Sequence, residues 1–150
     1  MTRTIVLDSG PLGMICHPNP RGEARHCQSW LQSMAARGNR IVIPEISDHE
    51  VRRELIRAKR STAISILNDL CVRHLFFALD TPQMILAAEL WAQVRNLGLP
   101  TAGPDSLDAA AILAAQALSL NGPAVVVATS NPGHLSRFVN AEPWQNFPTH

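Results

Sequence analysis

Short apolar runs that alternate with helical patterns constrain this sequence more than any other feature. In four of the runs the apolar residues follow one another directly and do not alternate with polar ones. These runs cover Thr4–Asp8, Arg40–Pro44, Arg73–Leu79 and Ala124–Thr129. Continuous apolar runs are typical of strands that are buried on both faces, as they are in a parallel sheet. The sequence therefore predicts a central parallel β-sheet.

Helical patterns occupy the segments between these runs. Apolar residues recur there at three- and four-residue spacing, in the segments Ala24–Arg37, Ser47–Arg60, Pro82–Leu97 and Asp105–Leu120. Pro82 in a first turn and Gly98 after a last turn are ordinary start and stop signals of a helix. Because strands and helices alternate along the chain, we expect an α/β fold, a three-layer α/β/α sandwich.

Length and composition agree with one such domain. Of the 150 residues, 46% are hydrophobic and 17% are charged, a balance that favours a packed core over disorder. No linker divides the chain, so residues 1–150 are expected to form a single domain. The segments expected to be loosest are Cys16–Arg21 and Pro143–His150.

Several other classes of protein are disfavoured. The most apolar stretch, Ala109–Leu120, is far shorter than the ~20 residues that span a bilayer. Asp8 lies where a signal peptide would have its apolar run, so we expect a cytoplasmic protein without membrane contact. The three cysteines Cys16, Cys27 and Cys71 have no CxxC spacing, which argues against a disulfide framework or a zinc site.

Basic residues are concentrated in one segment. The net charge is only +1, which argues against nucleic-acid binding by bulk charge alone. However, residues 52–60 contain four arginines and the only lysine, Lys59. A solvated helix face is the ordinary explanation of such a run. The alternative is a contact with phosphate oxygens, which arginine forks fit well.

Acidic residues stand at or near the ends of the predicted strands. Asp8 ends the first strand, Glu50 lies one turn into the helix after the second, and Asp105 and Asp108 open the last helix. Each has a plain structural explanation, namely a turn former, a surface pair of Glu50 with Arg53, and a variant capping box.

The chemical alternative is that these acids converge. The carboxyl ends of parallel strands meet at one edge of the sheet, where ligands gather. Carboxylates that meet there repel one another unless a cation neutralises them, and an all-oxygen ligand set suits Mg²⁺ or Mn²⁺. Such an ion can activate water and stabilise the charge that develops on a phosphodiester.

Four segments carry a resemblance to a known family. They are IVLDSGPLG, IPEISDHEVRREL, LDAAAILAAQAL and VVVATSNPGHLSRF. In this order and spacing the chain resembles the PIN-domain ribonucleases, which include the VapC-like toxins of VapBC-type toxin–antitoxin pairs. The resemblance implies a PIN-like parallel-sheet sandwich, RNA as substrate, cleavage with Mg²⁺ or Mn²⁺ held by acids, and an antitoxin protein as partner.

The resemblance also assigns site residues. Asp8 corresponds to the family's first acid and Glu50 to the second, and the turn from Thr129 to Asn131 borders the pocket, with Asn131 as its polar residue. Aligning AILAAQA with the family's Asp-x-x-Ile-Ala-Ala pattern places Ala110 where the third acid is expected.

Three residues are candidates to replace the missing acids. Asp108 lies two residues before Ala110 and Asp105 is a further candidate metal ligand, whereas His134 stands where many family members have a fourth acid. The predicted catalytic residues are therefore Asp8, Glu50 and Asp108. The predicted metal ligands are Asp8, Glu50, Asp108 and Asp105, and the predicted substrate contacts are Ser9, Arg53, Arg57, Asn131 and His134.

The function predicted from these residues is metal-dependent cleavage of RNA phosphodiesters, as the toxin of a toxin–antitoxin pair. The alternative is a PIN-fold module that binds RNA or a protein without turnover, since Ala110 has replaced an acid. A phosphoryl-transfer protein with Asp8 as phosphoacceptor is disfavoured, because no lysine lies near the last strand.

A homodimer is also expected. Family members commonly pair through helices, which is an analogy. Four large apolar residues on the predicted helices supply a physical motive for burying a surface: Trp30, Met34, Met84 and Trp91.

Overall fold

A parallel sheet forms the centre of the molecule. The computed structural model describes residues 2–98, 104–122 and 124–148, and for residues 104–106 it describes the backbone only. Within these ranges the sheet has five strands in the order β3-β2-β1-β4-β5, all parallel. The strands are β1 (Thr4–Leu7), β2 (Arg40–Pro44), β3 (Leu75–Phe77), β4 (Val125–Thr129) and β5 (Ala141–Pro143).

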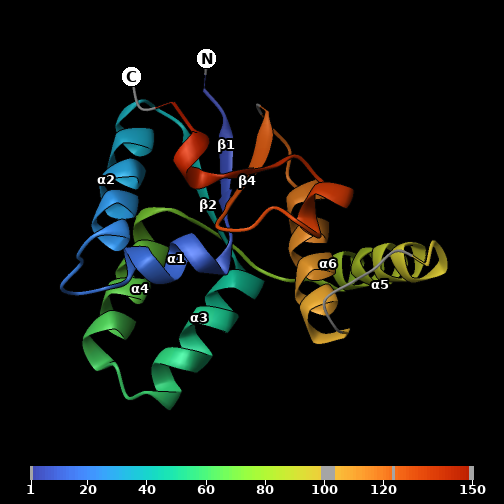
Figure 1. Cartoon of the computed structure of the whole chain (residues 1–150), viewed down its shortest axis with the longest axis horizontal. Helices are drawn as coiled ribbons and strands as arrows, with labels where there is room; N and C mark the ends of the chain where they lie inside the picture. Colours follow the sequence, from blue (N-terminus) through green and yellow to red (C-terminus); the bar gives the residue numbers. More distant parts are fainter. Residues whose placement is uncertain (1, 99–103, 123, 149–150) are drawn as a thin grey trace.

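Helices cover both faces of the sheet (Figure 1). They are α1 (Ser9–Ile15), α2 (Glu23–Ala36), α3 (Glu45–Arg57), α4 (Ser61–Arg73), α5 (Thr81–Asn96) and α6 (Pro104–Leu118), with 3-10 turns η1 (Leu135–Arg137) and η2 (Trp144–Asn146). In Figure 1, α1, α2 and α4 lie to one side of β1, β2 and β4, α5 and α6 lie to the other, and α3 lies below the lower ends of the strands.

The two faces of the central strand belong to two different cores. Ile5 and Leu7 of β1 pack in the cluster that contains α1, α2 and α4 residues, whereas Val6 packs with Leu113 and Ala117 of α6. All of these β1 side chains are fully buried, as the continuous apolar run predicted. The expected three-layer α/β/α sandwich with a parallel sheet is confirmed.

Two helices were not predicted. Helix α1 starts directly after Asp8, and α4 occupies Ser61–Arg73, where its buried Ala63, Leu67 and Leu70 repeat at helical spacing. The strand predicted over Arg73–Leu79 is consequently shorter, because Arg73 still belongs to α4. The helix expected over Ser47–Arg60 ends at Arg57, since the chain turns at Lys59, whose φ is +56°.

The C-terminal segment is packed rather than loose over residues 143–147, which corrects the expectation for Pro143–His150 in that part; residues 149–150 lie outside the described residues. Trp144 and Phe147 contact the ring of Trp30, with ring centroids 5.8 and 5.4 Å apart. Trp30 and Met34 are therefore core residues, 3% and 2% exposed, and the expectation that they form a dimer surface was wrong. Among the described helices, none combines the length and the apolar character required to cross a bilayer.

Candidate active site

Asp8 stands at the carboxyl edge of the sheet, between two neighbouring strands. The pairing of Leu7 with Ala128 brings the residues that follow, Asp8 and Thr129, to the same edge. One Asp8 oxygen, Oδ1, accepts a 2.7 Å hydrogen bond from the Ser9 backbone N–H and caps α1, and Oδ2 accepts a 2.7 Å bond from the Thr129 hydroxyl. Each carboxylate oxygen keeps a second lone pair, so the carboxylate is oriented and still able to bind a cation.

The start of α1 lies against the turn that follows β4. A Cβ atom added at Gly10 would stand 2.7 Å from the Ser130 hydroxyl oxygen, which is closer than real contacts allow. The absence of a side chain at Gly10 thus lets α1 and the turn after β4 approach each other closely.

Glu50 reaches the same edge from α3. In Figure 1 the carboxyl ends of β1 and β2 point downwards, and α1 and α3 begin there. A surface hollow at this point is lined by Asp8, Ser9, Glu50, Arg53, Ala109, Ala110, Asn131, His134 and Leu135. The structure therefore brings together two of the predicted acids and four of the predicted substrate contacts.

The two acids in the hollow influence each other electrostatically. The pKa of Glu50 is raised above its usual value, first by burial and second by the negative charge of Asp8. The positive charges of Arg53 and His49 act in the opposite direction. The Arg53 guanidinium lies 4.0 Å from a Glu50 oxygen, and 64% of its side chain is exposed. Ionised Glu50 is therefore held here at a cost that a bound cation would relieve.

Glu50→Gln is expected to raise the melting temperature at pH 7 in metal-free buffer. A raised folded-state pKa means that ionised Glu50 destabilises the fold, and this penalty grows as pH rises from the unfolded-state pKa through the folded-state one. At pH 4 both states are largely protonated, so the difference should vanish. Thermal unfolding at the two pH values checks this, with Glu54→Gln on the same helix as the control. A lower melting temperature for Glu50→Gln at pH 7 would contradict it.

Asp108 does not join this hollow. Its side chain is exposed, whereas Ala109 and Ala110 line the hollow. Two residues correspond to about 200° around a helix, so a side chain at position 108 leaves α6 on nearly the opposite face from one at position 110. No group of three His, Cys, Asp or Glu side chains that could hold a metal occurs in the described part of the chain. The side chain of Asp105 lies outside the described residues.

Arg57 is also separate from the hollow. Its guanidinium binds both carboxylate oxygens of Glu54 on the exposed surface of α3. This is the ordinary solvated pair that a basic run on a helix often makes, and Arg53 is the arginine that borders the hollow.

The resemblance placed Thr129 in the turn that borders the pocket, but the hydrogen bond from Thr129 to Asp8 was not predicted. Thr129 is 1% exposed, donates to Asp8, and accepts a 3.1 Å hydrogen bond from the Asn131 backbone N–H. A polar residue that ends a strand next to the strand of the first acid is the signal that could have found it. Through Thr129 the β4 turn is tied to the carboxylate of Asp8.

Comparison with known proteins shows the fold. No family model and no curated protein matches the chain. Among solved structures, it is similar to a chain of VapBC2 from Rickettsia felis bound to a DNA fragment from their promoter, with TM-score 0.66 and 17% identity over 94% of this chain and 98% of that one.

Two further structures agree. The chain is similar to one in FitAcB from Neisseria gonorrhoeae, with TM-score 0.66 and 20% identity over 96% of this chain and 100% of that one. It is also similar to a chain of DNA-bound VapBC from Salmonella typhimurium, with TM-score 0.60 and 16% identity over 95% of this chain and 99% of that one. Over nearly its whole length, the chain therefore shares the fold of a component of these VapBC and FitAcB structures.

Proposed function

We propose that this protein is a metal-dependent endoribonuclease that acts as the toxin of a toxin–antitoxin pair. The observation that carries the proposal is the meeting of Asp8 and Glu50 in one hollow at the carboxyl edge of a parallel sheet. The likeness of the fold to VapBC and FitAcB chains supports the same assignment.

The donor chemistry of the hollow fits Mg²⁺ or Mn²⁺. Mg²⁺ is commonly bound by one or two carboxylates and keeps several waters, and Asp8 and Glu50 supply two carboxylates. When bound, the ion would polarise a phosphodiester oxygen and activate water. His134, which also lines the hollow, adds an imidazole nitrogen, which a softer ion such as Mn²⁺ accepts better than Mg²⁺.

The remaining residues of the hollow would bind and orient the RNA strand. Arg53 is mostly exposed and only 4.0 Å from Glu50, so its fork can turn to a phosphate when a cation neutralises the acids. Ser9, Asn131 and His134 border the same space and supply polar groups for the substrate. Thr129 and the Ser9 amide keep the Asp8 carboxylate in one orientation throughout.

A second candidate function is favoured by Ala110. Where a third carboxylate would face the hollow, α6 presents a methyl group. With two acids the site binds a divalent ion less tightly than with three, and the fold would then serve to bind RNA or a protein partner without turnover.

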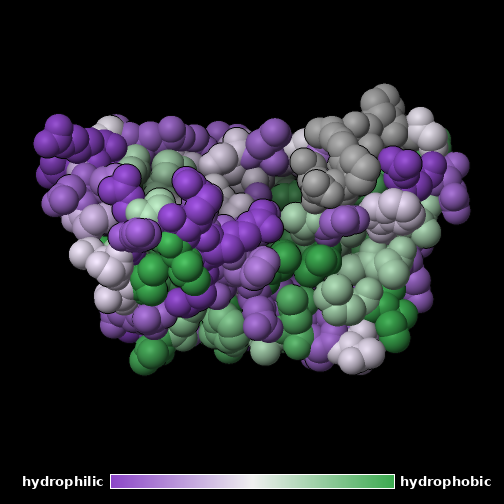
Figure 2. Space-filling view, turned by 90° about the horizontal axis from the view of Figure 1, so that it is seen from below, coloured by the Kyte–Doolittle hydropathy of each residue, from purple (hydrophilic) through white to green (hydrophobic). Residues whose placement is uncertain are grey.

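Two partner predictions remain. The likeness to chains in VapBC structures supports an antitoxin protein as partner. A homodimer stays a prediction as well, but Trp30 and Met34 are buried in the core and do not belong to its expected surface. Hydrophobic residues gather over the part of the molecule formed by α5 and α6 in Figure 2, and Met84 and Ile85 of α5 are 44% and 56% exposed.

Incubation of the purified protein with single-stranded RNA tests the proposed function. We expect cleavage with Mn²⁺ or Mg²⁺ and none after chelation, because the ion stabilises the transition-state charge. Titration calorimetry with Mn²⁺ alone checks metal binding in the same preparation. RNA binding without cleavage under every divalent ion would favour the second candidate. The absence of both would overturn the ribonuclease proposal and would leave only the protein-binding form of the second candidate.

A further inference from the structure

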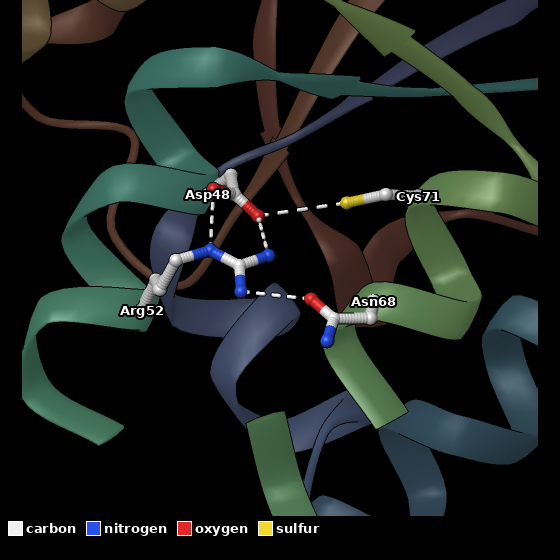
Figure 3. A network of polar contacts seen from close by, with 4 residues as sticks. All are labelled: Asp48, Arg52, Asn68 and Cys71. Atoms are coloured by element: carbon white, nitrogen blue, oxygen red, sulfur yellow. Dashed lines mark hydrogen bonds and ion pairs between the residues drawn. The ribbon is translucent and has the colours of Figure 1, made fainter. Parts of the chain in front are cut away.

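A polar network joins α3 to α4 away from the hollow (Figure 3). The Arg52 guanidinium donates two hydrogen bonds to Asp48, from Nε to Oδ2 at 3.0 Å and from Nη2 to Oδ1 at 2.9 Å. Its third nitrogen, Nη1, donates to Oδ1 of Asn68 on α4 at 2.8 Å. The Cys71 thiol, also on α4, donates to Asp48 Oδ1 at 3.5 Å. Two residues of α3, Asp48 and Arg52, are thus hydrogen-bonded to two residues of α4, Cys71 and Asn68.

Glu50 lies midway between the two α3 members of this network. Because residues two apart differ by about 200° around a helix, Glu50 leaves α3 on the side nearly opposite to Asp48 and Arg52. The contacts agree, since Asp48 and Arg52 bind α4 and Glu50 lines the hollow with Asp8. One side of α3 is therefore anchored, and the other side presents the acid.

Stability alone is a weak reason for such a pair. Asp48 is 7% exposed and the Arg52 side chain 30% exposed. The desolvation of the nearly buried Asp48 carboxylate offsets much of the attraction between the two charges, and replacement of such a pair by well-packed apolar residues is often neutral or stabilising. The best-attested benefit of buried polar contacts is geometric, because they allow one register between two elements and penalise the others. A fork that binds both oxygens of a carboxylate is especially selective for one orientation.

We propose that Asp48 and Arg52 are positioning residues for Glu50, because they fix the rotation of α3 about its own axis and so hold the Glu50 carboxylate beside Asp8. This inference rests on the proposed function insofar as Glu50 is a metal ligand.

The magnitudes support a role in positioning. Side chains extend about 5–6 Å from a helix axis, so a rotation of α3 by roughly 20° would move the Glu50 carboxylate by about 2 Å. Bonds from oxygen to Mg²⁺ are about 2.0–2.1 Å long and demand near-octahedral geometry. A displacement of that size would remove Glu50 from an ion held by Asp8.

The double variant Asp48→Leu/Arg52→Met tests the proposal. Its free energy of unfolding should be no lower than that of the wild type, whereas its Mn²⁺ affinity should fall about tenfold or more, as it does when residues that orient metal ligands are lost. Denaturant unfolding and electron paramagnetic resonance of free Mn²⁺ measure the two quantities. Arg52→Lys keeps the charge and loses the two-pronged guanidinium, so it should also lower the Mn²⁺ affinity. If the double variant does not fold, Arg52→Lys tests the positioning role instead.

Asp69→Leu/Arg73→Met is the matched control. These residues form the same Asp–Arg pair at i,i+4 on α4, at 2.8 Å, but their side chains are 59% and 60% exposed. The control should change neither quantity. Unchanged Mn²⁺ affinity in a folded Asp48→Leu/Arg52→Met or Arg52→Lys protein would overturn the proposal.

A metal-free measurement separates this proposal from the proposed function. The side-chain carboxyl carbon resonance of Glu50 at pH 7 should shift in Asp48→Leu/Arg52→Met and stay in place in the control. If the wild type binds neither Mn²⁺ nor Mg²⁺, the proposed function fails, and this resonance alone decides whether the network positions Glu50. An unmoved resonance would then overturn the positioning role.

Discussion

Asp8→Asn is expected to lower Mn²⁺-dependent RNA cleavage by about 100-fold or more and to leave the free energy of unfolding unchanged or slightly higher. The substitution removes one negative charge from the pair with Glu50, whose pKa Asp8 raises, so the repulsion between the two groups is relieved. The loss of a ligand weakens the binding of the ion, which supplies several kcal/mol of transition-state stabilisation. Each ~1.4 kcal/mol of lost stabilisation lowers the rate by a factor of ten.

The capping role of Asp8 is preserved in this variant, and its hydrogen bond with Thr129 reverses, because the Asn amide nitrogen donates to the hydroxyl that donated to Oδ2. The amide oxygen of Asn can still accept the hydrogen bond from the Ser9 N–H that caps α1, and Asn is as good a capping residue as Asp. Asp8→Ala removes the cap as well and should cost about 1 kcal/mol of stability. Melting temperatures, Mn²⁺ affinity and cleavage are measured on the wild type and both variants. If Asp8→Asn loses stability but keeps Mn²⁺ affinity, Asp8 is a structural cap and not a ligand.

Strands β1, β2 and β4 could be predicted because they are buried on both faces, whereas the half-buried edge strand β5 was not predicted. The observed β2 has the predicted bounds, and β1 and β4 differ from theirs by one residue, since each is a continuous apolar run. The sequence was less informative where burial is one-sided. Helix α4 buries only one stripe of side chains, and its last residue was assigned to the next strand. The C-terminal segment owes its order to Trp30, which is distant in sequence.

The same distinction applies to the site. Asp8 and Glu50 could be placed together because both follow parallel strands at positions that the chain order determines. The contact between Thr129 and Asp8 depends on the register of β1 with β4, which no local pattern reveals. Asp48 and Arg52 show an ordinary i,i+4 spacing, identical to that of the exposed Asp69 and Arg73, and only the packing against α4 makes the first pair less exposed than the second.

Ala110→Asp is expected to raise the Mn²⁺ affinity about tenfold or more and to increase cleavage by a similar factor. Ala110 lines the hollow with Asp8 and Glu50, so a carboxylate there adds a third oxygen ligand, and ~1.4 kcal/mol of added binding free energy is a factor of ten. Without metal the variant should be less stable than the wild type, because a third negative charge adds repulsion and Asp is a poorer helix former than Ala.

Mn²⁺ should therefore raise the melting temperature of Ala110→Asp more than that of the wild type. A ligand stabilises the folded state by RT ln(1 + [L]/Kd), so at one Mn²⁺ concentration the variant with the lower Kd gains more. Asp108→Asn is the control, because the exposed Asp108 does not line the hollow, and it should leave Mn²⁺ affinity and cleavage unchanged. Loss of Mn²⁺ binding in Asp108→Asn would make Asp108 a ligand after all. If Ala110→Asp binds Mn²⁺ more tightly yet cleaves no better, a third carboxylate is not what limits turnover, and the module that binds without cleaving becomes the better description.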